Sequence, residues 1–204
     1  MIAVEDCVLI LLAAGQSSRF PQGNKLEAEF LGKPVGLHVA TAFEDMPFRA
    51  RIVVTDGCRL EFPHYRVIHN EAPDEGLARS LRLGVEAART ERPAAVVIAL
   101  ADMPRVTAAH VYRLLDAAGG PDAVVASSDG TKPLPPAVFG AARLDALEGL
   151  SGDAGAREMV AGGHHVVTSP AELIDIDTPE DLDRLRALVG SADAITRAEA
   201  RRSD

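Results

Sequence analysis

The chain of 204 residues is poor in cysteine, in aromatic residues and in positive charge, and each shortage excludes a class of protein. Cys7 and Cys58 are the only cysteines, and they lie far apart without a CxxC pair. Two isolated thiols form neither a disulfide framework nor a cysteine-rich metal site. We therefore expect reduced thiols and a cytoplasmic location.

The charge balance argues against a nucleic-acid partner. The chain has 30 acidic and 21 basic residues, which gives a formal net charge of −9. A protein that binds nucleic acid usually carries a basic stripe that displaces counterions from the phosphates. Aromatic residues make up 4% of the chain and tryptophan is absent, so stacking of bases on exposed rings is not expected either.

Long apolar runs are also lacking. The longest early run, residues 8–14, is far shorter than the about 20 residues that span a bilayer. It follows Glu5 and Asp6, whereas a signal peptide begins with a cationic segment. The sequence predicts neither a membrane anchor nor a signal peptide.

What the chain does contain is an alternation of short β-branched or leucine-rich runs with longer amphipathic stretches. This pattern is typical of an α/β fold, in which helices cover both faces of a mostly parallel sheet. The length predicts a single domain, residues 1–190, followed by a charged, alanine-rich tail, residues 191–204. The seven expected strands are residues 7–13, 51–55, 66–68, 95–100, 123–126, 166–168 and 173–176.

Four helices are expected between these strands, because apolar residues recur there at helical spacing. Two of them have a clear start: Thr107 is a plausible N-cap, and Thr178 precedes a proline and two acids. The four apolar stripes begin at Val35, Leu77, Val111 and Leu182.

The first candidate site is the loop after the first strand. Small residues around Gly15 allow backbone N–H groups to approach a phosphate, and Arg19 and Lys25 supply positive charge. The loop matches neither the GxxxxGK[ST] nor the GxGxxG pattern, which argues against a P-loop kinase and an NAD-dependent Rossmann enzyme. The alternative interpretation is a tight turn with surface charges beyond it.

The other candidate sites are acidic. Asp102 follows a strongly apolar strand, at the edge where open parallel sheets bind ligands, and one carboxylate often holds a Mg²⁺ that bridges substrate phosphates. Asp175 and Asp177 alternate with isoleucines, so on a strand both carboxylates face one side, where a cation would offset their repulsion. Alternatively, Asp102 caps the next turn and Asp177 caps the last helix.

In this order along the chain, these motifs resemble the MobA-like nucleotidyltransferases, and most closely the molybdenum cofactor cytidylyltransferases, over about residues 8–188. The segments that carry the resemblance are LLAAGQSSRF with Lys25, GKPVGLHV, NEAPDEGLARSLRLG, ALADMP, LSGDAGAR and IDIDTPEDL. The resemblance implies a three-layer Rossmann-like nucleotidyltransferase fold with a mostly parallel central sheet. It also implies transfer of CMP from CTP to molybdopterin, with Mg²⁺ (or Mn²⁺) as cofactor and release of pyrophosphate.

The resemblance further assigns roles to residues. Lys25, Arg19 and Asp102 would be catalytic, Asp102, Asp175 and Asp177 would bind the metal, and Asp153 with Arg157 would bind the acceptor. Ala14 in LAAG favours CTP, because guanylyl-transferring relatives typically have LAGG. The nucleotide would contact Leu12, Ala13, Ala14, Gly15, Arg19, Lys25, Asn70, Gly76, Ser80 and Asp102.

Two departures from the family pattern keep other functions open. Asn24 stands where the family often has Asp, and residues 131–136 lack the Gly-His-Pro run of many molybdopterin-handling relatives. A second hypothesis is therefore transfer from CTP or another NTP to a different phosphorylated molecule, such as a sugar or polyol phosphate. A third is a non-catalytic nucleotide or cofactor carrier. Delivery of the product to an apo-molybdoenzyme is suggested by the resemblance alone.

Overall fold

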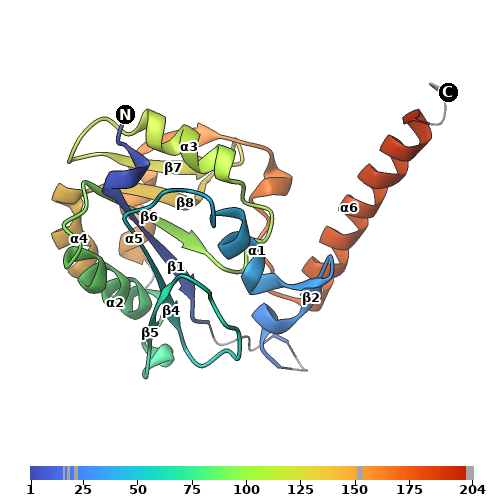
Figure 1. Ribbon diagram of the computed structural model, residues 1–204, viewed down its shortest axis with the longest axis horizontal. Helices are drawn as coiled ribbons and strands as arrows, with labels where there is room; N and C mark the ends of the chain where they lie inside the picture. The colour runs from blue at the N-terminus through green and yellow to red at the C-terminus, as the bar shows by residue number, and fades with distance from the viewer. Residues whose placement is uncertain (16, 18, 21–22, 151–153, 201–204) are drawn as a thin grey trace.

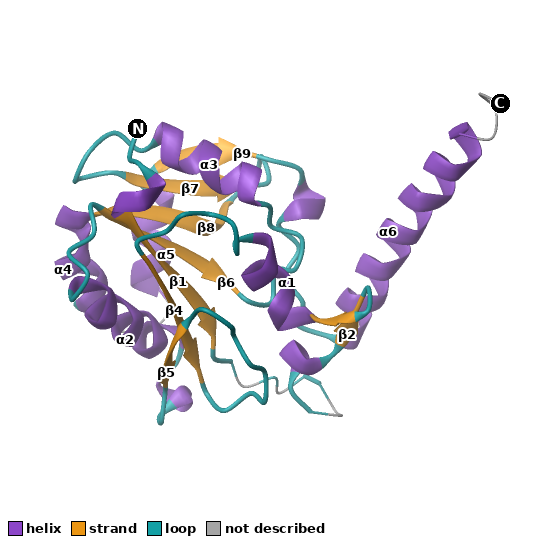
Figure 2. Ribbon diagram, viewed as in Figure 1, coloured by secondary structure: helices purple, strands orange, loops and turns teal. Residues whose placement is uncertain are grey.

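The computed structural model describes residues 1–15, 17, 19–20, 23–150 and 154–200, without the side chains of 154–156 and 191–200. Its centre is a seven-stranded sheet in the order β5-β4-β1-β6-β8-β7-β9 (Figures 1 and 2). The strands are β1 (Cys7–Ala13), β4 (Ala50–Thr55), β5 (Arg66–His69), β6 (Ala95–Leu100), β7 (Val124–Ser128), β8 (Pro133–Gly140) and β9 (His164–Val167).

The sheet is mostly parallel, as the sequence predicts. β1 pairs in parallel with β4 and β6, β5 with β4, and β9 with β7, whereas β8 runs antiparallel between β6 and β7. All seven residues of β1 are buried, because this strand lies between β4 and β6 and is covered on both faces. The carboxyl ends of β1, β4, β5 and β6 therefore meet at one edge.

Helices form a layer on each face, which makes three layers in all. Leu9 and Leu11 of β1 pack on the side of α1 (Val35–Ala42) and α3 (Ala108–Ala117). Val8 and Ile10 point to the opposite side, towards α2 (Leu77–Arg89) and α4 (Leu144–Glu148). α5 (Ala154–Ala161) packs against β7 and β8.

A third apolar cluster anchors the last helix, α6 (Pro179–Ala200). Leu182 and Leu185 of α6 pack with Ile176 and with Phe30 of a short hairpin, β2 (Glu29–Phe30) and β3 (Lys33–Pro34). Beyond this contact α6 extends away from the body of the molecule (Figure 1). The boundary expected at residue 190 falls inside α6, and the division into a domain and a tail stays a prediction.

The start of α6 has the Thr178 cap that its sequence predicts, and the structure shows that the cap is reciprocal. The Thr178 hydroxyl accepts a hydrogen bond from the Asp181 backbone N–H (3.2 Å), and Asp181 Oδ2 accepts from the Thr178 N–H (2.9 Å) and hydroxyl (2.8 Å). These hydrogen bonds lower the pKa of Asp181. Thr107 likewise caps α3, because its side chain accepts from the His110 N–H.

One expected strand is wrong. Residues 173–176 are not a strand, since β1 and β8 already occupy the two sides of β6 and leave no ladder position beside it. The seventh strand is instead β8, whose first half contains three prolines. Prolines are rare inside strands. These three lie at the end of the β7–β8 ladder, beside the register shift opposite Ala126 and Ser127 of β7.

Three short 3-10 turns also matter for the site and for the predictions below: η2 (Lys25–Glu27), η3 (Pro73–Glu75) and η5 (Pro170–Glu172). Within the part of the chain that the structure describes, no helix has the length and apolar character needed to cross a membrane.

Candidate active site

The loops that leave the carboxyl ends of β1, β4, β5 and β6 bring the polar residues of the candidate site to one edge of the sheet. Gly15 follows β1, Asp56 follows β4, Asn70 follows β5 and Asp102 follows β6. This edge is where open α/β sheets bind ligands, because the loops there are free to vary while the strands hold their ends in place.

Local hydrogen bonds fix the position of Lys25. The Lys25 backbone N–H donates to the Ser17 hydroxyl (3.0 Å), and the Asn24 side chain accepts from the Leu26 N–H (2.9 Å). Asn24, which stands where the family often has Asp, therefore caps η2 without adding negative charge.

The Lys25 ammonium lies between two carboxylates from distant parts of the sequence. Lys25 Nζ is 2.6 Å from Asp102 Oδ2 and 2.8 Å from Asp177 Oδ1. The side chains of Lys25 and Asp102 are 11% and 17% exposed, and that of Asp177 is 45% exposed. Arg19, which is 68% exposed, reaches the other oxygen of Asp177 at 3.3 Å. The structure thus brings four of the predicted site residues into one ion-pair cluster.

A backbone contact explains why Asp177 meets Asp102. The Ile176 N–H donates to the Asp102 carbonyl oxygen (2.9 Å), and the Ile176 side chain is fully buried in the cluster beneath α6. Asp175 is exposed on one side of Ile176, and Asp177 is half-buried on the other. The two acids therefore flank the buried Ile176 in a segment that is not a strand. The sequence-based expectation that a strand carries both carboxylates on one face is wrong.

Burial and charge act in opposite directions on the paired groups. Burial alone would lower the pKa of Lys25, but the attraction and hydrogen bonds of Asp102 and Asp177 outweigh it and raise the pKa. For Asp102, burial raises the pKa, Lys25 lowers it, and the nearby charges of Asp175 and Asp177 add to the increase. The lysine is thus held in its charged form by the two carboxylates.

A cavity of about 340 Å³ opens beside the glycine loop. Gly76, at the N-cap of α2, adopts φ +83° and ψ −175°, a conformation that glycine alone adopts without strain. This conformation turns the chain from η3 into α2, so that the first turn of the helix faces the loop. The lining residues are Ala14, Gly15, Pro73, Asp74, Gly76, Leu77 and Ser80.

Five of the predicted nucleotide residues lie at this cavity or next to it. Ala14, Gly15, Gly76 and Ser80 line it. Asn70 lies behind it, where its side-chain amide donates to the Ser80 hydroxyl (2.9 Å).

The remaining predicted residues lie in the framework or at the surface. Leu12 and Ala13 are buried in β1, and the Leu12 carbonyl accepts a hydrogen bond from the Ala101 N–H. Arg157 is exposed on α5, whereas Asp153 lies outside the described residues.

Asp56 is a residue that the sequence analysis missed. Its Oδ2 accepts a hydrogen bond from the Gly15 backbone N–H at 2.9 Å, so it contacts the glycine loop directly. The signal was the one used for Asp102, a single acid that follows a buried strand at the ligand-binding edge of the sheet.

The acids fit a divalent cation that also binds substrate phosphates. Asp102 Oδ1 is buried and has no hydrogen-bond partner among the described residues. This oxygen is therefore available to accept a ligand at the cluster. Among those residues, no three His, Cys, Asp or Glu side chains gather closely enough to hold a metal by themselves. The arrangement suits Mg²⁺ or Mn²⁺, which commonly take one or two carboxylates and complete their shell with phosphates and water.

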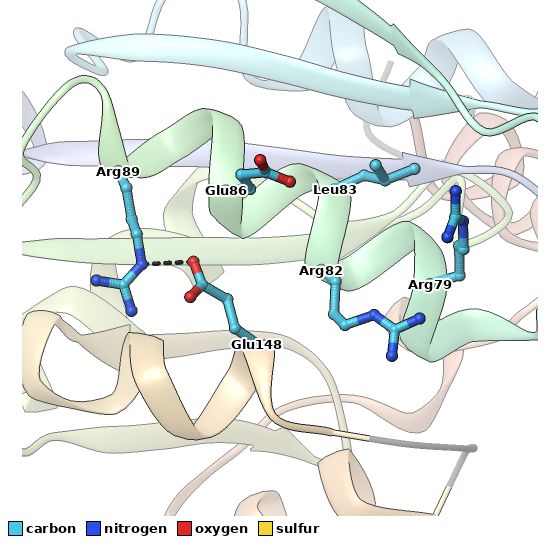
Figure 3. Close-up of a pocket in the computed structure, with 6 residues that line it drawn as sticks. All are labelled: Arg79, Arg82, Leu83, Glu86, Arg89 and Glu148. Atoms are coloured by element: carbon cyan, nitrogen blue, oxygen red, sulfur yellow. Dashed lines mark hydrogen bonds and ion pairs between the residues drawn. The ribbon is translucent and has the colours of Figure 1, made fainter.

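A second cavity, of about 450 Å³, lies along the flank of α2 and contains none of the predicted site residues (Figure 3). Its arginines already have acidic partners: Arg79 and Arg82 pair with Glu75, and Arg89 with Glu148 and Asp145. This internal pairing leaves little positive charge for an anionic ligand.

Comparison with known proteins places the whole arrangement in a family. Residues 9–168 match the model of the MobA-like NTP transferase domain. The purine catabolism protein PucB of Bacillus subtilis is 30% identical over 196 residues, covering 87% of this chain and 94% of the relative. The bifunctional enzyme IspD/IspF of a Sulfurovum species is 34% identical over 120 residues, which cover 55% of this chain and 30% of that enzyme.

Solved structures agree at the level of the fold. Rv0371c of Mycobacterium tuberculosis superimposes with a TM-score of 0.76 at 23% identity, covering 91% of this chain and 99% of that one. Molybdopterin-guanine dinucleotide biosynthesis protein A of Archaeoglobus fulgidus gives a TM-score of 0.62 at 18% identity, with 90% and 99% covered. With the ion-pair cluster at the expected edge of the sheet and the family match over residues 9–168, the chain belongs to the MobA-like NTP transferase family of nucleotidyltransferases.

Proposed function

We propose that this protein transfers CMP from CTP to the terminal phosphate of molybdopterin and releases pyrophosphate. The observation that carries the proposal is the Lys25 ammonium, which joins Asp102 and Asp177 at the sheet edge where the glycine loop and its cavity also lie. Cations next to buried acids suit a reaction between two polyanionic substrates.

The chemistry requires positioning and charge neutralisation rather than a protein nucleophile. An oxygen of the acceptor phosphate forms a bond to the α-phosphorus of CTP as the bond from that phosphorus to the leaving pyrophosphate breaks. Lys25 and Arg19 offset the charge on the departing pyrophosphate. Because the chain carries a net charge of −9, these local cations have to provide the attraction for both anions.

Asp102 and Asp177 are the residues that would hold a divalent cation, with Asp175 adding negative charge nearby. The cation supplies neutralisation of the α- and β-phosphates when bound. A structure of the mycobacterial Rv0371c protein is described as a complex with manganese, which supports Mn²⁺ as well as Mg²⁺ as the ion to test.

CTP is proposed as donor on the basis of the loop. Ala14 lines the cavity beside Gly15, and it is the residue of LAAG that resembles cytidylyl-transferring rather than guanylyl-transferring relatives. We assign Ser80, whose hydroxyl accepts a hydrogen bond from Asn70, and the backbone at Gly76 to the base, because both residues line the cavity.

Molybdopterin is proposed as acceptor on family resemblance, supported by the name of the Archaeoglobus structure. Arg157, which is exposed on α5, would bind the acceptor together with Asp153, with the Arg157 guanidinium contacting the phosphate. Delivery of the product to an apo-molybdoenzyme would follow from the same assignment.

A different phosphorylated acceptor, such as a polyol phosphate, is the second candidate. The proline-rich strand β8 favours it, because this region lacks the Gly-His-Pro run of many molybdopterin-handling relatives. A non-catalytic carrier is less well supported, since a carrier requires no buried ion-pair cluster beside the nucleotide cavity.

The test is a matrix of pyrophosphate-release assays that combines CTP, GTP, ATP and UTP with molybdopterin and with simple sugar and polyol phosphates. We expect release with CTP and molybdopterin, dependent on Mg²⁺ or Mn²⁺. Asp102→Asn is the inactive comparison, and Asp116→Asn, which changes an exposed acid on α3, is the matched control. Pyrophosphate release with a sugar or polyol phosphate but not with molybdopterin would overturn the molybdopterin assignment. Tight CTP binding that needs no metal and releases no pyrophosphate would favour the carrier.

A further inference from the structure

The Lys25 ammonium occupies the position where a cation would contact both acids of the site. It lies 2.6 Å from Asp102 Oδ2 and 2.8 Å from Asp177 Oδ1, on a side chain that is 11% exposed. These are short charge-assisted hydrogen bonds. A metal ion that used the same two oxygens would have to displace the ammonium.

Displacement without a replacement partner is unfavourable. Lys25 is buried and its backbone is fixed by Ser17, so an ammonium moved from the two carboxylates would lose both hydrogen bonds and remain poorly solvated. A divalent ion next to the ammonium would also be repelled, strongly so at this short range in a buried setting. The ligand-free site therefore resists a metal ion that arrives alone.

A polyphosphate changes this balance, because it supplies the anion that Lys25 would lose. If Lys25 turns to a phosphate oxygen, Asp102 and Asp177 become available together with the buried Asp102 Oδ1, which lacks a partner among the described residues. Arg19 lies at the exposed edge of the cluster, where its side chain is 68% exposed, so its contact with Asp177 is readily exchanged for water.

We infer that Lys25 is an internal counter-ion that keeps the metal position closed until a nucleotide binds. This inference rests on the proposed function, since it assigns Lys25 to the nucleotide phosphates. Metal and nucleotide then bind with positive coupling, and by linkage each raises the affinity for the other by the same factor. The site selects the NTP–metal complex over either component alone.

The experiment is a titration of the ligand-free protein with Mn²⁺, followed by electron paramagnetic resonance. Lys25→Met removes the charge but keeps the aliphatic stem. We expect this variant to bind Mn²⁺ at least tenfold more tightly than the wild type in the absence of nucleotide. Lys33→Met is the matched control, because the Lys33 ammonium contacts Thr41 rather than a carboxylate. It should bind Mn²⁺ as the wild type does.

Wild-type protein that binds Mn²⁺ alone as tightly as Lys25→Met would overturn the inference. Should Lys25→Met fail to fold by circular dichroism, Lys25→Gln replaces it, because the amide can still donate to Asp102. Adding Asp102→Asn to the lysine variant should abolish the new Mn²⁺ binding, and binding that persists would place the ion elsewhere and contradict the inference.

The same titration separates this inference from the proposed function. If Lys25→Met binds Mn²⁺ tightly but the wild type releases no pyrophosphate with any substrate, the counter-ion role stands and the proposed reaction is wrong. If the wild type is active but Lys25→Met binds Mn²⁺ no more tightly than the wild type, the proposed reaction stands and the counter-ion role is wrong.

Discussion

The carboxylate of Asp56 accepts a hydrogen bond from the backbone N–H of Gly15 over 2.9 Å. The sequence predicts that this N–H group donates to a phosphate, yet in the structure its acceptor is a side-chain carboxylate. An anion of the protein therefore lies where an anion of the substrate is expected, just as the Lys25 ammonium lies where a metal is expected.

Asp56→Asn tests whether this carboxylate opposes nucleotide binding. Asparagine still offers an oxygen to the Gly15 N–H, so the loop keeps its hydrogen bond, but the negative charge beside the triphosphate is removed. We expect CTP affinity, measured by calorimetry, to rise about fivefold, which corresponds to roughly 1 kcal/mol for one charge pair at this partly exposed position. Glu44→Gln, a change to an exposed acid, is the control. Weaker CTP binding by Asp56→Asn would mean that the carboxylate serves the nucleotide instead.

Asp102→Asn tests the acidic side of the proposed reaction. The substitution keeps the size of the side chain and leaves Lys25 paired with Asp177, so the fold should persist. Loss of one well-placed electrostatic contact typically costs about 3–4 kcal/mol in the barrier, and we expect kcat to fall by roughly 10²–10³. The readouts are pyrophosphate release and a far-ultraviolet circular dichroism melt. Near-normal turnover would remove Asp102 from the mechanism.

Much of the fold could be predicted because its signals are local. The apolar runs of β1 and β6 and the Thr107 cap of α3 depend on neighbouring residues, and all three are confirmed. Residues 174–177, which overlap the expected strand 173–176, alternate apolar and acidic side chains as a strand would. A strand beside β6 also requires a free ladder position, and β6 has none. Which strands lie next to each other depends on the whole sheet, so a local sequence pattern cannot predict it.

The candidate site could be predicted in its members but not in their pairing. Arg19, Lys25, Asp102 and Asp177 do come together, from segments that are distant in the sequence. The roles suggested by family resemblance place the cations on phosphates and the acids on a metal, and those roles stay predictions. In the structure, the same charges neutralise one another, and this pairing depends on three-dimensional distances rather than on motif spacing.

Gly84→Ala tests the close packing of α2 on the sheet. A Cβ at Gly84 would lie 2.5 Å from Ile10 Cγ2 and 3.3 Å from Val54 Cγ2, so the helix would have to move away from β1 and β4. Overpacking of this kind typically costs about 1–3 kcal/mol, and we expect the free energy of unfolding in urea to fall by that amount. Gly119→Ala is the control, because nothing lies within 4 Å of its added Cβ. Equal stability of the two variants would contradict the close contact.

Glu172 connects α3 to the segment after β9, and this link should depend on pH. Its Oε1 accepts from the Thr107 hydroxyl (2.5 Å) and N–H (3.1 Å), and its Oε2 accepts from the Thr168 hydroxyl (2.5 Å). Burial raises the pKa of Glu172, but the hydrogen bonds from Thr107 and Thr168 outweigh it and leave the pKa below the ordinary value of 4.5. The folded protein therefore favours the charged form.

Because the pKa of Glu172 is lower in the folded than in the unfolded state, its contribution to stability is present above pH 4.5 and is lost as the pH falls through the folded-state pKa. Hydrogen bonds to a charged group contribute about 1.5–3 kcal/mol when buried, and solvent screening at this half-exposed position reduces the expectation to about 1 kcal/mol. Glu172→Gln should lower the free energy of unfolding by that amount at pH 7, and the difference from wild type should shrink as acid is added. Urea unfolding at several pH values measures this, with Glu71→Gln, an exposed glutamate, as the control. A difference that stays constant from neutral to acidic pH would mean that Glu172 stabilises the protein by packing rather than by charge.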